Sequence, residues 1–241
     1  MDYLNSSRSL RDRHTSFLHG TSIVVLAKSD SLLIAADSKV CAFSDSASGH
    51  FTNMNKIYRL SDRAYFSSCG IVGDTAGHFS VEREVRRVFS EEKSLERTAA
   101  QLRITFTPLL KTLMNELRTA SFAEFKKQFR PPGVLSIVMI SYENNPECHV
   151  LTFHPHDDEN DINISVNQLP SPPFGNVFNI CRLGNQGYKP QLNAAKDSHE
   201  AVDIAKRLIA GEIELAPDEV GFPIDAVVLS RQGERHFHFD R

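Results

Sequence analysis

Apolar runs separated by short polar turns dominate the first third of the chain. Residues 20–28 and 32–38 are rich in β-branched and other apolar side chains and flank Ser29-Asp30-Ser31, a pattern that predicts a β-hairpin. Because antiparallel partners face each other across the turn, we expect Asp37 opposite Ser22. The hairpin therefore brings a carboxylate to within one residue of Thr21.

A second hairpin is predicted further along the chain. Residues 56–60 and 64–70 are two short segments with apolar and aromatic residues on either side of a Ser-Asp-Arg turn. The same pairing rule places Lys56 opposite Ser68 and leaves Gly70 at the open end of this hairpin.

The middle of the chain changes to helical spacing and then returns to strands. We expect a helix over about 76–89, capped by Asp74 or Thr75, and a second over 95–118 that Pro108 should kink or split. Further apolar segments predict strands at 134–140, 149–153, 177–180, 224–230 and 236–239, with a helix near 199–210. Strands, helices, strands, helix and strands suit two sheets packed face to face with helices outside.

Composition is consistent with a single globular domain over residues 21–241. The 241-residue chain has 41% hydrophobic residues, 24% charged residues and a net charge of −3. This balance argues against a nucleic-acid-binding protein, which would show a clustered basic face. No apolar run is long enough to cross a membrane, and the four cysteines lack the close spacing of zinc sites. We expect buried thiols, no metal, no cofactor and a cytoplasmic location.

Residues 1–20 form a distinct N-terminal segment. They combine serines and arginines with no apolar core, so they do not resemble a secretory signal peptide. From composition alone they fit a flexible tail, and a Ser/Arg-rich transit peptide is a thinner alternative because Asp2 and Asp12 interrupt the bias.

Four short motifs carry a resemblance to a known family. Gly20-Thr21 before a strand, Ala35-Ala36-Asp37-Ser38, Asn55-Lys56-Ile57 and the Gly-x-x-x-Asp from Gly70 resemble those of proteasome β-type subunits, which are N-terminal-nucleophile hydrolases. The resemblance is densest over residues 20–90. It implies an α+β fold, a four-layer αββα sandwich of two antiparallel sheets flanked by helices. It also implies that residues 1–20 are a propeptide removed by cleavage between Gly20 and Thr21.

The resemblance assigns the catalytic groups. Thr21 falls on the family's N-terminal threonine, Asp37 and Lys56 on its active-site aspartate and lysine, and Gly70 on its oxyanion-hole glycine. The chemistry is coherent, because a threonine hydroxyl needs a base and a free α-amine titrates near neutral pH. Lys56 would lower the pKa of that amine, Asp37 would neutralise Lys56, and the N–H of Gly70 would stabilise the oxyanion.

Two supporting positions depart from the family pattern. The family has a serine within a Gly-Ser-Gly loop, where this chain has Asn185, and an Asp-x-x-Ser, where this chain has Asp218 but Gly221 in place of the serine. Asn185 retains the capacity to hydrogen-bond an amine.

Three functions remain open from the sequence. The first is a threonine-type peptidase acting on peptides or proteins, the second an amidase acting on a small amide through the same Thr21 chemistry. The third is a non-catalytic ring subunit that keeps residues 1–20. The resemblance further implies a homo-oligomeric ring, with an ATPase or other regulator as a partner that the sequence does not identify.

Overall fold

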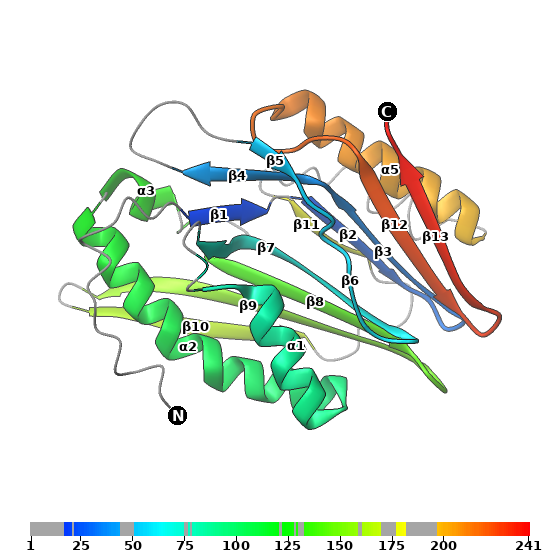
Figure 1. Cartoon of the computed structure of the whole chain (residues 1–241), viewed down its shortest axis with the longest axis horizontal. Coiled ribbons are helices and arrows are strands. Elements are labelled where there is room, and N and C mark those ends of the chain that lie inside the picture. Colours follow the sequence, from blue (N-terminus) through cyan, green and yellow to red (C-terminus); the bar gives the residue numbers. More distant parts are fainter. Residues whose placement is uncertain are drawn as a thin grey trace.

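Two antiparallel β-sheets lie face to face between two layers of helices (Figure 1). The structure is a computed structural model, and it describes residues 17–20, 22–43, 51–74, 77, 79–120, 122–127, 129, 133–158, 161–169, 177–181 and 197–241. This arrangement confirms the expected α+β sandwich.

The first sheet contains eight strands. Seven follow the order β10-β9-β8-β7-β1-β4-β5, and β6 pairs with β7 outside this path. Their bounds are β1 Phe17–Gly20, β4 Lys39–Phe43, β5 Phe51–Asn53, β6 Tyr58–Ser61, β7 Ala64–Asp74, β8 Leu135–Tyr142, β9 Pro146–Asp158 and β10 Asp161–Leu169.

The second sheet contains five strands in the order β11-β2-β3-β12-β13. Their bounds are β2 Ser22–Ala27, β3 Ser31–Asp37, β11 Val177–Cys181, β12 Ile224–Ser230 and β13 Gly233–Phe239. In the β2–β3 hairpin Ile23 faces Ala36, which is the register that the sequence predicts.

The helices cover the outer faces of the sheets. α1 (Val81–Glu92), α2 (Leu95–Ala120) and the short α3 (Phe122–Lys127) lie on the side of the first sheet, and α5 (Ser198–Leu215) lies against the second (Figure 1). In the described part of the chain no helix has the length and apolarity needed to cross a membrane.

Successive side chains of β2 point to opposite faces of its sheet, and both faces are buried. Ile23 and Val25 belong to the core between the sheets, whereas Val24 and Leu26 pack in the core beneath α5. A strand covered on both faces buries every side chain, so it appears in the sequence as a continuous apolar run.

Two helix predictions need correction. α1 begins at Val81 with Ser80 as its N-cap, whose side chain accepts the N–H of Arg83, instead of starting near residue 76. Asp74 is instead the last residue of β7. α2 runs through Pro108 without being split, because Pro108 and the preceding turn at Ile104 are exposed, where water can satisfy the carbonyl that loses its donor.

The strand β1 was not expected from the sequence. Residues 17–20 belong to the segment interpreted as a propeptide or tail, yet they pair with β4 on one side and β7 on the other. Gly20 ends β1 in the first sheet and Ser22 begins β2 in the second, so the chain changes sheets at position 21.

Candidate active site

Asp37 is a buried carboxylate at the end of β3. It is 1% exposed, and its Oδ1 accepts the backbone N–H of Ser22 at 3.1 Å. This contact follows from the β2–β3 register, which brings the first residue of β2 to the last residue of β3. The carboxylate is therefore held directly beside the start of β2.

Lys56 forms the closest charged contact to Asp37. Its Nζ lies 2.7 Å from Asp37 Oδ1, and the lysine is 4% exposed. Burial lowers the pKa of Lys56 below its usual value, while the charge of Asp37 and the hydrogen bond to it act in the opposite direction. The family resemblance implied that these residues share one site, and the structure brings them into direct contact.

The segment that carries Lys56 is fixed at both ends. The N–H of Met54 donates to the carbonyl of Ser38 at 2.8 Å, next to Asp37. At its other end β6 pairs with β7 through Tyr58 and Phe66, in the register that the sequence predicts. Lys56 thus reaches Asp37 from a backbone anchored to both sheets.

Two backbone N–H groups form hydrogen bonds to the second oxygen of the Asp37 carboxylate, and neither was predicted from the sequence. Oδ2 accepts the N–H of Lys39 at 3.0 Å and that of Gly221 at 3.2 Å. Gly221 lies between α5 and β12, at the position where the family pattern has a serine. A Cβ there would lie 3.0 Å from Lys39 Cδ, so a side chain would push against Lys39. The only signal in the sequence was the position of Gly221 three residues after Asp218.

Gly70 lies in β7 between β8 and β1. It pairs with Leu135 on one side and with Gly20 on the other. Its φ is +90°, and a Cβ would lie 2.4 Å from the carbonyl oxygen of Val134. Position 70 therefore requires glycine for both its backbone conformation and its close contact with β8.

Of the other predicted site residues, Thr21, Asn185 and Asp218, the structure describes only Asp218. Thr21 and Asn185 lie outside the described residues. Asp218 has an exposed side chain on the turn after α5, and its backbone carbonyl accepts the thiol of Cys41 at 3.1 Å. The supporting role suggested for Asp218 and Asn185 stays a prediction.

Cys41 is the other nucleophilic side chain near this cluster. It lies in β4, and burial raises the pKa of its thiol despite the nearby charges of Lys39 and Lys56. A thiol nucleophile acts as the thiolate, so these surroundings do not activate Cys41. Among the described residues no group of three or more His, Cys, Asp or Glu side chains could hold a metal ion.

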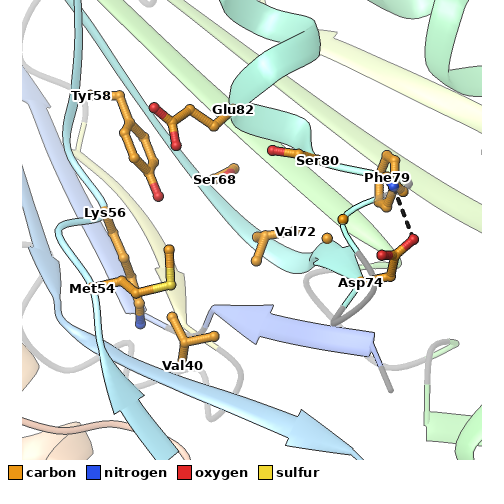
Figure 2. A pocket seen from close by; sticks show the side chains of 12 residues that line it. Val40, Met54, Lys56, Tyr58, Ser68, Val72, Asp74, Phe79, Ser80 and Glu82 are labelled. Atoms are coloured by element: carbon orange, nitrogen blue, oxygen red, sulfur yellow. Dashed lines mark hydrogen bonds between the residues drawn. The ribbon is translucent and has the colours of Figure 1, made fainter. Parts of the chain in front are cut away.

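A cavity of about 160 Å³ adjoins Lys56 (Figure 2). It lies against the helix face of β7 and the start of α1. Its described lining consists of Val40, Met54, Lys56, Tyr58, Ser68, Val72, Gly73, Asp74, Gly77, Phe79, Ser80 and Glu82. The site thus combines a buried charged pair with a mainly apolar recess beside it.

Comparison with known families agrees with this geometry. No curated protein matches the chain. The family model for proteasome subunits matches residues 17–157, which is more than half of the chain and includes Asp37, Lys56 and Gly70. A chain with this two-sheet sandwich and this match belongs to the proteasome subunit family.

Proposed function

We propose that this proteasome-family subunit is a threonine-type peptidase whose nucleophile is Thr21, freed by cleavage after Gly20. The observation that carries the proposal is the buried Asp37–Lys56 pair. It lies next to Ser22, whose N–H is bound to Asp37, and Ser22 directly follows Thr21. Desolvation offsets much of the attraction within a buried ion pair, so stability alone is a weak reason for such a pair, and perturbed lysine pKa values cluster at functional sites.

Cleavage after Gly20 would create the general base. The nitrogen of Thr21 is an amide in the precursor and accepts no proton, whereas the free amine titrates near neutral pH. That amine takes the hydroxyl proton as Thr21 Oγ1 bonds to the substrate carbonyl carbon. Lys56 disfavours a second positive charge on the amine and so keeps it available as a base.

The covalent steps then follow from the same groups. The N–H of Gly70 stabilises the negative oxygen of the tetrahedral intermediate. The C–N bond of the substrate breaks, the leaving amine receives the proton held by the Thr21 amine, and an ester to Thr21 remains. Water hydrolyses this ester and restores the hydroxyl.

The position of β1 supports a peptide as the substrate. Its two neighbours, β4 and β7, pair with it along its length, and it ends at the residue before Thr21. Loss of residues 1–20 would leave two strand edges with unpaired backbone groups. A second peptide can add to such edges as an extended strand.

Substitution of Thr21 tests the proposal. In Thr21→Ala we expect no peptide hydrolysis and an intact mass that corresponds to the full-length chain, because both reactions need the hydroxyl. The wild type should be active and lighter by the mass of residues 1–20. Thr21→Ser keeps a hydroxyl and should retain both reactions. A full-length wild-type protein that hydrolyses peptides would contradict the N-terminal-nucleophile mechanism.

A non-catalytic ring subunit is the second candidate, and one observation favours it. Residues 17–20 are paired on both sides within the sheet, so the uncleaved segment contributes backbone hydrogen bonds to the fold. A wild-type protein that is full-length and inert in the same assay would establish this alternative.

We also propose that the subunit assembles into a homo-oligomeric ring, as its family membership suggests. Three large apolar side chains, Ile104, Leu109 and Phe122, are 66%, 38% and 57% exposed on α2 and α3. Sedimentation velocity of the purified chain should give a species of at least about six subunits, since head-to-tail interfaces generate a ring when the rotation between subunits closes. A monomer that persists at micromolar concentration would contradict ring formation.

A further inference from the structure

Glu212 is a buried carboxylate in the last turn of α5, outside the groups assigned to catalysis. The residue is 1% exposed, and its Oε1 has no hydrogen-bond partner among the described residues. It shares one face of α5 with Ala205 and Leu208, which are buried in the core beneath the second sheet. The side chain of Glu212 therefore points into the layer between α5 and that sheet.

The position of Glu212 is unfavourable for a negative charge in the uncleaved chain. Burial removes the water that would solvate the carboxylate, and an oxygen without a partner gains no hydrogen bond in return. The C-terminal end of a helix carries partial negative charge, and the last turn of α5 contains no basic residue. The stability of the uncleaved chain therefore gives no reason for a glutamate at this position.

Glu212 lies level with the start of β2. α5 begins near the end of β2, where Lys28 and Asp197 are close enough to interact electrostatically, and it runs back along the second sheet (Figure 1). A helix rises about 22 Å from residue 197 to residue 212, and a strand spans about 20 Å from residue 28 to residue 22. Ser22 points to the same side as Val24, which packs beneath α5. Ser22 and Glu212 thus lie at the same end of one layer.

The segment after α5 agrees with this placement. The N–H of Ala216 donates to the carbonyl of Glu212 at 2.8 Å, and the N–H of Gly221 donates to Asp37 Oδ2 at 3.2 Å. Asp37 also accepts the N–H of Ser22 at 3.1 Å. A short segment therefore connects Glu212 to the carboxylate of the candidate active site.

We propose that Glu212 is the counter-charge for the ammonium that the Thr21 amine becomes when it takes the proton of the Thr21 hydroxyl. The inference rests on the proposed peptidase function and adds an electrostatic residue to that site. Cleavage after Gly20 creates the amine one residue before Ser22, so a positive partner for Glu212 arises at its own end of the layer. The proton passes from the hydroxyl to the amine and then to the leaving group, and Glu212 itself exchanges no proton.

The two nearest charge effects on the amine act in opposite directions. Lys56 disfavours the ammonium form, whereas Glu212 favours it, and Asp37 is already paired with Lys56 at 2.7 Å. Even about 10 Å apart, at an effective dielectric constant of about 20, two unit charges change each other's pKa by about 1. Glu212 should therefore raise the pKa of the amine by about this amount.

The other charged groups at this end belong to β4 and to the segment after α5. Lys39 donates its ammonium to the carbonyl of Pro217. Asp218 has an exposed side chain, and Glu219 is half-buried. All three are the same in the uncleaved chain, in the cleaved chain and in every variant of Glu212, so comparisons between these forms isolate Glu212.

The pH dependence of peptide hydrolysis tests this role. In Glu212→Gln the amine should lose its proton at lower pH, so the acidic limb of the kcat/KM profile should move down by about one pH unit. The plateau of kcat should fall about threefold with KM unchanged, because the ammonium exists only during the reaction and a weaker base accepts the proton less readily.

Two further variants serve as controls for the pH profile. Glu212→Asp keeps the charge and should leave the acidic limb closer to wild type than Glu212→Gln does. Glu214→Gln removes an exposed carboxylate from the same end of α5 and should leave the limb at its wild-type position. An unmoved limb in folded, active Glu212→Gln would overturn the inference and leave the peptidase function intact.

Stability provides a second, independent test. In the uncleaved Thr21→Ala chain, Glu212→Gln should keep or raise the midpoint of urea unfolding, because it removes a buried charge. In the cleaved protein at pH of about 6, where a free amine is protonated, the same substitution should lower the midpoint. An equal change in both forms would overturn the inference. A wild-type chain that stays full-length and inert would overturn the proposed function and this inference with it.

Discussion

Asp37→Ala should lower the free energy of unfolding by about 3–5 kcal/mol and abolish peptide hydrolysis, because it leaves a buried lysine without its partner. Lys56 is 4% exposed and its Nζ binds Asp37 Oδ1 at 2.7 Å. The substitution also removes the acceptor for the backbone N–H groups of Ser22, Lys39 and Gly221. Chemical denaturation followed by circular dichroism measures the loss.

Lys56→Met should destabilise the protein less than Asp37→Ala. The carboxylate would keep three backbone donors, which stabilise its charge when the ammonium is removed. Hydrolysis should nevertheless be lost, and Lys56→Arg should not restore it, because the planar guanidinium is larger than the ammonium and cannot take its place beside Asp37. Full activity in Lys56→Arg would show that only a distant positive charge matters.

A double-mutant cycle and a surface pair provide the controls. Asp37→Ala combined with Lys56→Met should cost less stability than the sum of the two single changes, since neither charge is then left alone. Lys111 and Asp161 form the same type of pair on the surface, with side chains 39% and 52% exposed. Asp161→Ala should leave stability close to wild type, because exposed pairs are screened by water. Strict additivity in the buried pair would contradict its coupling.

Gly70→Ala is the second substitution with a large expected effect. The positive φ of +90° imposes about 1–3 kcal/mol of backbone strain on alanine. The added Cβ would also lie 2.4 Å from the carbonyl oxygen of Val134, and overpacking of this kind costs about 1–3 kcal/mol. That carbonyl accepts the N–H of Ile71 at 2.9 Å, so it cannot move away without breaking the ladder. Thermal or urea unfolding should show the sum of both effects, together with loss of hydrolysis.

Gly77→Ala separates the two causes. Gly77 also has a positive φ, +74°, but no atom lies within 4 Å of a Cβ built there. This variant should show the backbone strain alone and unfold at a higher denaturant concentration than Gly70→Ala. Equal destabilisation by the two variants would show that the contact with Val134 carries no cost.

Local sequence patterns were sufficient to predict much of the fold and part of the candidate site. Apolar runs and a short turn predict the β2–β3 hairpin, and its register alone brings Asp37 to Ser22. The β12 strand was expected over residues 224–230 and spans Ile224–Ser230. These features depend on neighbouring residues and on periodic burial, which a sequence displays directly. The pairing of Lys56 with Asp37 came from the family resemblance, because the two lie in different hairpins.

Other features depend on contacts between segments far apart in the chain. Residues 1–20 as a whole have a composition typical of a tail, yet β4 and β7 provide partners on both sides of residues 17–20 and make them a strand. Gly221 reaches Asp37 from 184 residues away through a backbone N–H, a group that every residue except proline carries and that no sequence pattern marks. The cavity beside Lys56 forms where β4, β7 and the start of α1 meet. The hairpins and their registers were thus determined by the sequence alone, whereas the surroundings of Asp37 and the shape of the recess were decided by packing between distant elements.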